Sequence, residues 1–176
     1  VEYTDTGYYM IVSHGRHLDE SATAEIRQIF VSAEIAEDAD KPTDEAWTAA
    51  EAKANELLDS WKAGEKTAES FGTLATENNM SNGGLVTGFT ASSTSSEDMK
   101  TWIFADGRAA GDTTVIKYES GSYHGYYVLY YQGEGDPAWK LTAANSLASD
   151  AMSAWMDENL TGYSAQLDSG AENLGR

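Results

Sequence analysis

The sequence contains no cysteine among its 176 residues, which excludes disulfide bonds, thiolate metal sites and a cysteine nucleophile. It is also poor in basic residues, with 11 lysines and arginines against 29 aspartates and glutamates and a formal net charge of −18. Without a basic stripe to neutralise phosphates, this composition argues against nucleic acid and an anionic membrane surface as partners. The acidity serves either solubility or the attraction of basic client segments.

No run of the sequence approaches the roughly 20 apolar residues of a membrane-spanning helix, so we expect no direct membrane insertion by this segment. Hydrophobic residues make up 41% of the chain and include five tryptophans, which suffices for the core of one domain with appendages. The chain begins at Val1 rather than Met, and we therefore expect it to be a piece of a longer protein.

The stretch 111–133 predicts a β-hairpin around which the rest of the chain is organised. Residues 113–118 are rich in β-branched side chains and residues 126–131 are aromatic and apolar, as strands prefer. Residues 119–122 between them are turn formers. Because two strands alone are marginally stable in water, other elements must extend and cover this sheet.

The remaining elements follow from local patterns. Residues 25–31 alternate and predict a strand. Thr43 is a candidate N-cap, with Asp44 and Glu45 in a first turn where the helix dipole favours acidic residues, and Gly64 fits the end of that helix. Further elements are expected as a helix at 67–78, a strand at 85–89, a helix at 96–105 and a long helix at 136–160.

The long helix carries an apolar stripe, which we interpret as a face that packs into the core rather than as a cofactor site. The polar tail after it, 161–176, is expected to be loosely held. The stripe comprises Leu141, Ala144, Leu147, Ala148, Ala151, Met152 and Trp155.

The N-terminal segment contains Gly7-Tyr8-Tyr9-Met10-Ile11-Val12, which echoes the strand sequence that begins at Gly125. Two interpretations are open. Residues 1–12 are either the last strand of a truncated preceding unit or, as we slightly favour, a similar strand in the same sheet. His14, Arg16 and His17 follow in an expected exposed loop, and no third ligand accompanies the histidines, so we expect no metal there.

Five short motifs occur in an order and at a spacing that resemble the parvulin-type peptidyl-prolyl isomerases, over residues 25–133 or about three fifths of the chain. The motifs are Ile26-Arg27-Gln28-Ile29-Phe30-Val31, Phe71-x-x-Leu74-Ala75, Asn82-Gly83-Gly84-Leu85 with Gly88-Phe89, Gly111-Asp112 through Val115, and Gly125-Tyr126-Tyr127-Val128-Leu129. Among parvulins, the form Trp102-Ile103-Phe104 with Arg108 and Gly111-Asp112 looks most like extracellular foldase domains of anaerobic Gram-positive bacteria.

The resemblance implies an α+β fold, with a small antiparallel or mixed sheet flanked by helices and a long additional C-terminal helix. It divides the chain into an N-terminal strand and linker at 1–24, a parvulin-like domain at 25–133, and a helix with a polar tail at 134–176. It also implies an extracellular or cell-surface location, with any anchor lying outside this segment, and no cofactor or metal.

A prolyl isomerase must favour the twisted amide, since the barrier to rotation is about 18–20 kcal/mol while cis and trans X-Pro lie within roughly 1 kcal/mol. It needs an apolar pocket for the ring and a site that handles the carbonyl. Parvulins use two buried histidines and a Cys or Asp, and here Gln28, Tyr127 and Ser81 (or Met80) match those positions. Met99 matches the pocket phenylalanine.

We therefore expect Ser81 to face the reacting carbonyl, with Gln28 and Tyr127 organising the floor of the site. Met99, Phe89 and Leu85 would hold the proline ring, and Trp102 is a further apolar candidate. All of these residues could instead be ordinary core residues without a role in catalysis. In that case the side chains of Gln28, Tyr127 and Ser81 would form hydrogen bonds with one another. His124 is expected to be an exposed turn residue, although a shifted strand register would let it replace the missing histidine.

Two functions follow from the resemblance. The first is a prolyl isomerase, of reduced activity because its polar residues are substituted, acting on X-Pro bonds of secreted or surface proteins. The second is a non-catalytic parvulin-fold chaperone or peptide-binding module. Both take unfolded or extended proline-containing polypeptides as partners. A third and less favoured hypothesis is that the chain is a purely structural appendage of a larger surface protein.

Overall fold

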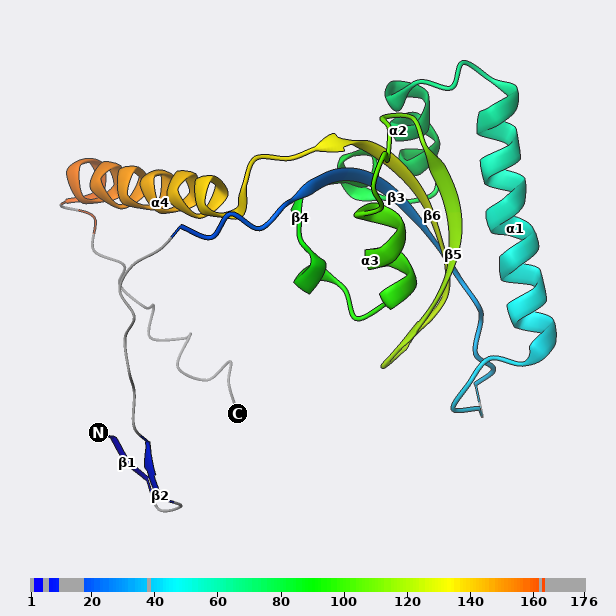
Figure 1. The fold of residues 1–176 in the computed structure, drawn as a ribbon, viewed down its shortest axis with the longest axis horizontal. Coiled ribbons are helices and arrows are strands. Elements are labelled where there is room, and N and C mark those ends of the chain that lie inside the picture. The colour runs from blue at the N-terminus through cyan, green and yellow to red at the C-terminus, as the bar shows by residue number, and fades with distance from the viewer. Residues whose placement is uncertain (1, 5–6, 10–17, 38, 162, 164–176) are drawn as a thin grey trace. The chain divides into compact units, whose positions relative to one another are not determined.

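The computed structural model describes residues 2–4, 7–9, 18–37, 39–161 and 163 (Figure 1). The chain divides into two compact units, 1–139 and 140–176, and each is described by itself. Among the described residues, no helix combines the length and the apolar character needed to cross a membrane.

The first unit is built on a four-stranded antiparallel sheet in the order β4-β3-β6-β5. The two central strands are β3 (Ala24–Ser32) and β6 (Tyr123–Glu134), and the edges are β4 (Leu85–Phe89) and β5 (Thr113–Ser120). With three α-helices in the unit that holds the sheet and the long C-terminal helix after them, the predicted α+β class is confirmed.

The central hairpin is also confirmed, with a tighter turn than the sequence suggested. β5 and β6 pair as far as Ser120 and Tyr123, which leaves only Gly121 and Ser122 in the turn. Gly121 adopts a φ of 58°, a left-handed value that glycine tolerates without steric cost. Each strand therefore extends two or three residues closer to the tip than predicted.

Two helices cover one face of the sheet, α1 (Asp44–Ala63) and α2 (Ala68–Glu77). Thr43 caps α1 by accepting a hydrogen bond from the Ala46 backbone N–H at 3.2 Å, as its sequence position predicts. The Trp61 indole N–H of α1 donates to the Ser70 hydroxyl of α2 at 3.0 Å, which ties the two helices together. The buried residues of this face are Ile29, Ala33, Ala50, Ala54, Leu57, Leu58, Trp61, Phe71, Ala75, Tyr126, Val128 and Tyr130.

A short helix, α3 (Glu97–Ile103), packs on the opposite face, and Figure 1 shows α1 and α3 on the two sides of the strands. Two 3₁₀ turns, η1 (Ser81–Gly84) and η2 (Ala91–Ser93), flank β4. The second core lies between α3 and the sheet and contains Ala24, Ile26, Phe89, Met99, Ile103, Ile116, Leu129 and Tyr131. A strand residue therefore reaches one core or the other according to its place in the alternation.

The long helix α4 (Ala138–Leu160) forms where the sequence predicts it, but its apolar stripe is not part of a core. None of its residues is buried, and Leu147 and Trp155 are 70% and 55% exposed. The expectation of a packed face was wrong, because periodicity identifies the face that would pack and says nothing about whether a partner is present. Of the predicted polar tail, only Thr161 and Tyr163 belong to the described residues.

The N-terminal segment contains β1 (Glu2–Thr4) and β2 (Gly7–Tyr9), which pair with each other in an antiparallel ladder. The four-stranded sheet does not include them, so the favoured interpretation of a strand in the same sheet was wrong. The other interpretation of the echo, a strand of a preceding unit, stays a prediction. Residues 10–12 and the predicted loop with His14, Arg16 and His17 lie outside the described residues.

Candidate functional site

A cavity of about 210 Å³ opens on the α3 face of the sheet, between β4, the η2–α3 connection and the central strands. Its lining combines apolar side chains, hydroxyls and one carboxamide, and none of the lining residues is charged. They are Gln28, Val86, Phe89, Ser93, Thr94, Met99, Tyr118 and Tyr127. Four of the six residues singled out from the sequence are among them.

The floor of the cavity is formed by Gln28 and Tyr127 on the two central strands. Phe30 of β3 lies directly opposite Tyr127 of β6, so Gln28, two residues back along β3, is a diagonal neighbour of Tyr127 on the same face. The strands thus bring together two side chains that are 99 positions apart in the sequence. Between them they offer an amide N–H₂, a carbonyl oxygen and a phenolic hydroxyl.

Met99 and Phe89 form the apolar wall, being 2% and 5% exposed. Met99 is held by the start of α3, where Ser96 caps the helix by accepting from the Met99 backbone N–H at 3.3 Å. The Thr94 hydroxyl lies 3.6 Å from the Met99 sulfur and accepts from the Ser96 backbone N–H at 3.1 Å. The rim of the cavity and its wall are therefore one hydrogen-bonded unit.

Ser81 lies outside the cavity. It is exposed at the start of η1, where Asn82 and Gly83 take left-handed backbone angles and turn the chain sharply into β4. Met80, the alternative for this position, packs against the core under α1 and α2. The role expected of Ser81 at the reacting carbonyl therefore has no support from its position, since the compact turn keeps this segment away from the cavity.

Leu85 also lies outside the cavity. It pairs with Arg27, whose guanidinium donates to the Gly83 carbonyl oxygen at 2.9 Å and lies beside Gly72 of α2. Because neighbouring strand residues point to opposite faces, Leu85 belongs to the α2 face and Val86 to the cavity. Leu85 was expected in the wall, whereas Val86 is the member of this pair that lines the cavity.

Four residues that line the cavity were not predicted from the sequence. They are Val86, Ser93, Thr94 and Tyr118. Val86 and Tyr118 could have been found from strand alternation, since Tyr118 follows Ile116 at an interval of two on β5. Ser93 and Thr94 lie in a serine- and threonine-rich stretch whose conformation the sequence left undefined. Trp102, the further apolar candidate, packs at the edge of the α3 core and does not line this cavity.

His124 is buried, with 7% of its surface exposed, and not in a solvent-exposed turn as expected. The tighter hairpin places it within β6, opposite Glu119, with its ring 6.1 Å from the Trp47 ring of α1. Its Nδ1 lies 3.9 Å from the Glu119 carboxylate. It therefore belongs to the α1 face, and it does not replace a histidine at the position of Tyr127.

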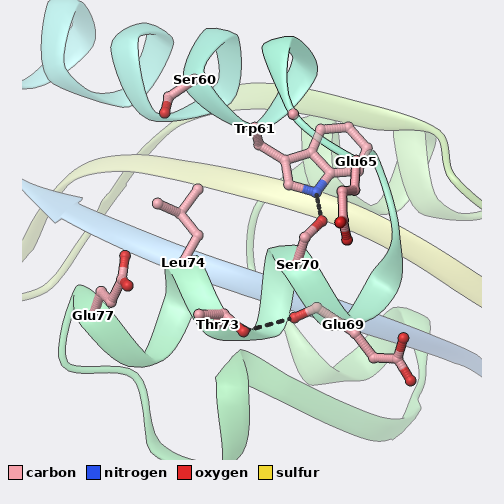
Figure 2. A pocket seen from close by; sticks show the side chains of 9 residues that line it. Ser60, Trp61, Glu65, Glu69, Ser70, Thr73, Leu74 and Glu77 are labelled. Carbon is pink, nitrogen blue, oxygen red and sulfur yellow. Dashed lines mark hydrogen bonds between the residues drawn. The ribbon is translucent and has the colours of Figure 1, made fainter.

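A second, larger hollow of about 380 Å³ lies between the end of α1 and α2 (Figure 2). Glu65, Glu69 and Glu77 surround it, and the Trp61 indole at its edge is already bonded to Ser70. In the part of the chain that the structure describes, no three histidine or acidic side chains are grouped so as to hold a metal ion. The acidic hollow offers no polar group besides those already engaged with the helices or facing solvent.

Burial raises the pKa of the Tyr127 hydroxyl, and the neighbouring Tyr118 and Tyr123 phenols add to the effect. Burial likewise raises the pKa of Tyr126, with a contribution from Glu51, and that of Tyr131, with a contribution from Glu134. Tyr127 is thus a neutral hydrogen-bond donor throughout the physiological range, and the only other titratable side chain among the lining residues is the phenol of Tyr118.

These raised pKa values predict a loss of stability in alkali. The unfolded chain releases its phenolic protons near pH 10, whereas the folded chain holds those of Tyr126, Tyr127 and Tyr131 to higher pH. The unfolded state therefore binds fewer protons above about pH 10, and the free energy of unfolding falls as the pH rises. Melting temperatures measured from pH 8 to 11 should fall by several degrees above about pH 10, and by less in Tyr127→Phe. An equal fall in wild type and variant would contradict the contribution of Tyr127.

Comparison with models of known protein families, with curated protein sequences and with solved structures gave no significant match to this chain.

Proposed function

We propose that the cavity binds the proline ring of an extended polypeptide and that the chain accelerates cis–trans isomerisation of the X-Pro bond. The observation that carries this proposal is the joint presence of Met99, Phe89, Gln28 and Tyr127 in one uncharged cavity of about 210 Å³. The apolar wall suits a pyrrolidine ring, and the neutral polar floor suits the adjoining amide. The resemblance to parvulins points to the same reaction.

The chemistry needs no nucleophile, metal or cofactor, because no covalent bond is made or broken. Rotation through the twisted amide localises the nitrogen lone pair and removes the conjugation with the carbonyl. With the ring held against Met99 and Phe89, the carbonyl end of the bond is free to turn over the floor. Tyr127 and Gln28 can donate hydrogen bonds there, and donors that bind the twisted amide better than either planar state lower the barrier.

A second candidate is a binding module that holds proline-containing segments without turnover. The uncharged lining favours it, since Gln28 and Tyr127 stand where parvulins have histidines and Ser81 lies outside the cavity. We place either activity outside the cell or at its surface, on secreted or surface polypeptides, as the foldase-like motifs suggest. The two candidates share one binding site and differ only in whether the bound amide rotates faster.

A magnetisation-exchange NMR assay on a short X-Pro peptide distinguishes them. Uncatalysed exchange takes tens of seconds, so catalysis appears as exchange cross-peaks on a timescale of a second or less. We expect acceleration that depends on the concentration of the chain. Peptide resonances that shift without faster exchange would support the binding module, and the absence of both effects would overturn the proposed function.

A further inference from the structure

Four aromatic rings lie together on the α3 face of the sheet, next to the cavity. We call Phe30, Tyr118, Tyr123 and Tyr127 the aromatic strip. The centroid of the Phe30 ring lies 4.8 Å from that of Tyr127 and 6.2 Å from that of Tyr123. The Tyr118 ring meets the Tyr127 ring edge to face at 5.2 Å. Three strands thus contribute to one continuous aromatic surface.

The backbone beneath the strip fixes its shape. A side chain at Gly125 would place its Cβ 2.8 Å from the Phe30 Cζ and 2.2 Å from the Val31 carbonyl oxygen. The Phe30 ring therefore lies over Gly125 because that position has no side chain. At the other end, the Ser95 hydroxyl lies 3.5 Å from the Tyr118 hydroxyl and 3.3 Å from the Ser120 hydroxyl, which restrains the Tyr118 ring.

The strip is open to solvent and continuous with the cavity. Tyr123 is 63% exposed, while Phe30, Tyr118 and Tyr127 are half-buried. Tyr118 and Tyr127 line the cavity and also belong to the strip, so the aromatic surface leads from the cavity toward the hairpin turn. The Tyr118 and Tyr123 phenols contribute to the raised pKa of Tyr127, which agrees with this proximity.

An extended polypeptide rises about 3.3 Å per residue, and side chains two residues apart point to the same side about 6.6 Å from each other. That interval is comparable with the ring-to-ring steps of the strip. An extended polypeptide with its proline in the cavity and its backbone along the strip would therefore present a side chain two residues away to the strip. Aromatic rings pair favourably at centroid distances of 4.5–7 Å, whereas none of the strip or cavity residues carries a charge to pair with a charged side chain.

We infer that the aromatic strip is a second subsite that selects clients with an aromatic or large apolar side chain two residues from the proline. This inference rests on the proposed function, because it places the proline of the same polypeptide in the cavity. The chain's net charge of −18 acts in the same direction, since it repels a client with an acidic residue at that position.

The test uses capped peptides that are identical except at the positions two residues before and two residues after a single proline. Phenylalanine, alanine or glutamate is placed at one of these positions at a time. Dissociation constants are measured by NMR titration on the full chain, on Phe30→Ser/Tyr123→Ser and on Tyr163→Ser as a control. Tyr163 is an 83% exposed tyrosine of the other unit, and circular dichroism checks that each variant folds.

We expect phenylalanine to bind at least fivefold more tightly than alanine in one of the two placements, and glutamate to bind more weakly than alanine. The ratio between phenylalanine and alanine peptides should fall to about one in Phe30→Ser/Tyr123→Ser and stay unchanged in Tyr163→Ser. Equal binding of phenylalanine and alanine peptides by the wild type would overturn the subsite while leaving the proline cavity in place. A ratio between phenylalanine and alanine peptides that persists in Phe30→Ser/Tyr123→Ser would also overturn the subsite, because the phenylalanine side chain would then bind elsewhere. If no proline peptide binds at all, the proposed function and the subsite fail together.

Discussion

Replacing Val86 with phenylalanine should reduce the affinity for X-Pro peptides, and any acceleration of their exchange, at least tenfold. Val86 lies on the edge strand β4 and lines the cavity of about 210 Å³. The larger side chain would occupy the space that we assign to the proline ring. Because the added volume enters an existing cavity, the melting temperature should change little or rise, as in other cavity-filling substitutions. Peptide titration and exchange NMR, with a thermal melt of the same sample, measure both effects.

Thr87→Phe is the matched control for this substitution. Thr87 is the next residue of β4 and is exposed, so the same phenylalanine is added to the same strand without entering the cavity. We expect its affinity for the peptide to stay within about twofold of the wild type, less than 0.5 kcal/mol of binding free energy. Equal losses in the two variants would mean that the cavity is not where the peptide binds. An unchanged affinity in Val86→Phe would lead to the same conclusion.

Gly125→Ala should lower the free energy of unfolding by about 3 kcal/mol or more, at the upper end of the cost of overpacking. The added Cβ would lie 2.2 Å from the Val31 carbonyl oxygen, a contact that real Cβ atoms do not make. Relief of this contact requires the central strands β3 and β6 to separate, and the Phe30 ring, whose Cζ would lie 2.8 Å from the added Cβ, must also move. The same substitution should therefore also weaken peptides that carry phenylalanine. Urea unfolding followed by tryptophan fluorescence measures the change in stability.

Gly121→Ala serves as the comparison within the same hairpin. A Cβ at Gly121 meets nothing within 4 Å, so only its left-handed φ of 58° penalises alanine. That conformational cost is about 1–2 kcal/mol. If Gly125→Ala proved no more destabilising than Gly121→Ala, the close packing of β3 against β6 at this position would be contradicted.

Much of the fold could be predicted because its signals are local. Thr43 caps α1 with an acidic first turn, and the aromatic and β-branched runs of the hairpin form β5 and β6. The environment of a side chain was harder to predict, since it depends on elements far apart in the sequence. His124 is buried because the turn closes two residues later than expected and Trp47 of a distant helix packs against it. The exposure of the α4 stripe could not be predicted either, because hydrophobic periodicity does not reveal whether the apolar face has a packing partner.

In the candidate site, too, some residues could be placed from local sequence patterns and others could not. Gln28 and Tyr127 could be placed together because both belong to regular strands, and a matching motif identified each one. Ser81 could not be placed by counting from Phe71, because left-handed residues in η1 turn the chain away from the cavity. The choice between Leu85 and Val86 depends on the phase of one short strand, in which a shift of one residue exchanges the two faces.

The central claim is that an X-Pro segment binds against Met99, and the ε-methyl resonance of Met99 reports this most directly. The chain has five methionines, so the ¹³C methyl spectrum is simple, and Met99→Leu assigns the signal. We predict that titration with a proline peptide shifts the Met99 methyl signal, while the same peptide with alanine in place of proline leaves it unchanged. A Met99 signal that stays fixed while the peptide binds, or that responds equally to both peptides, would contradict the binding of the proline ring against Met99.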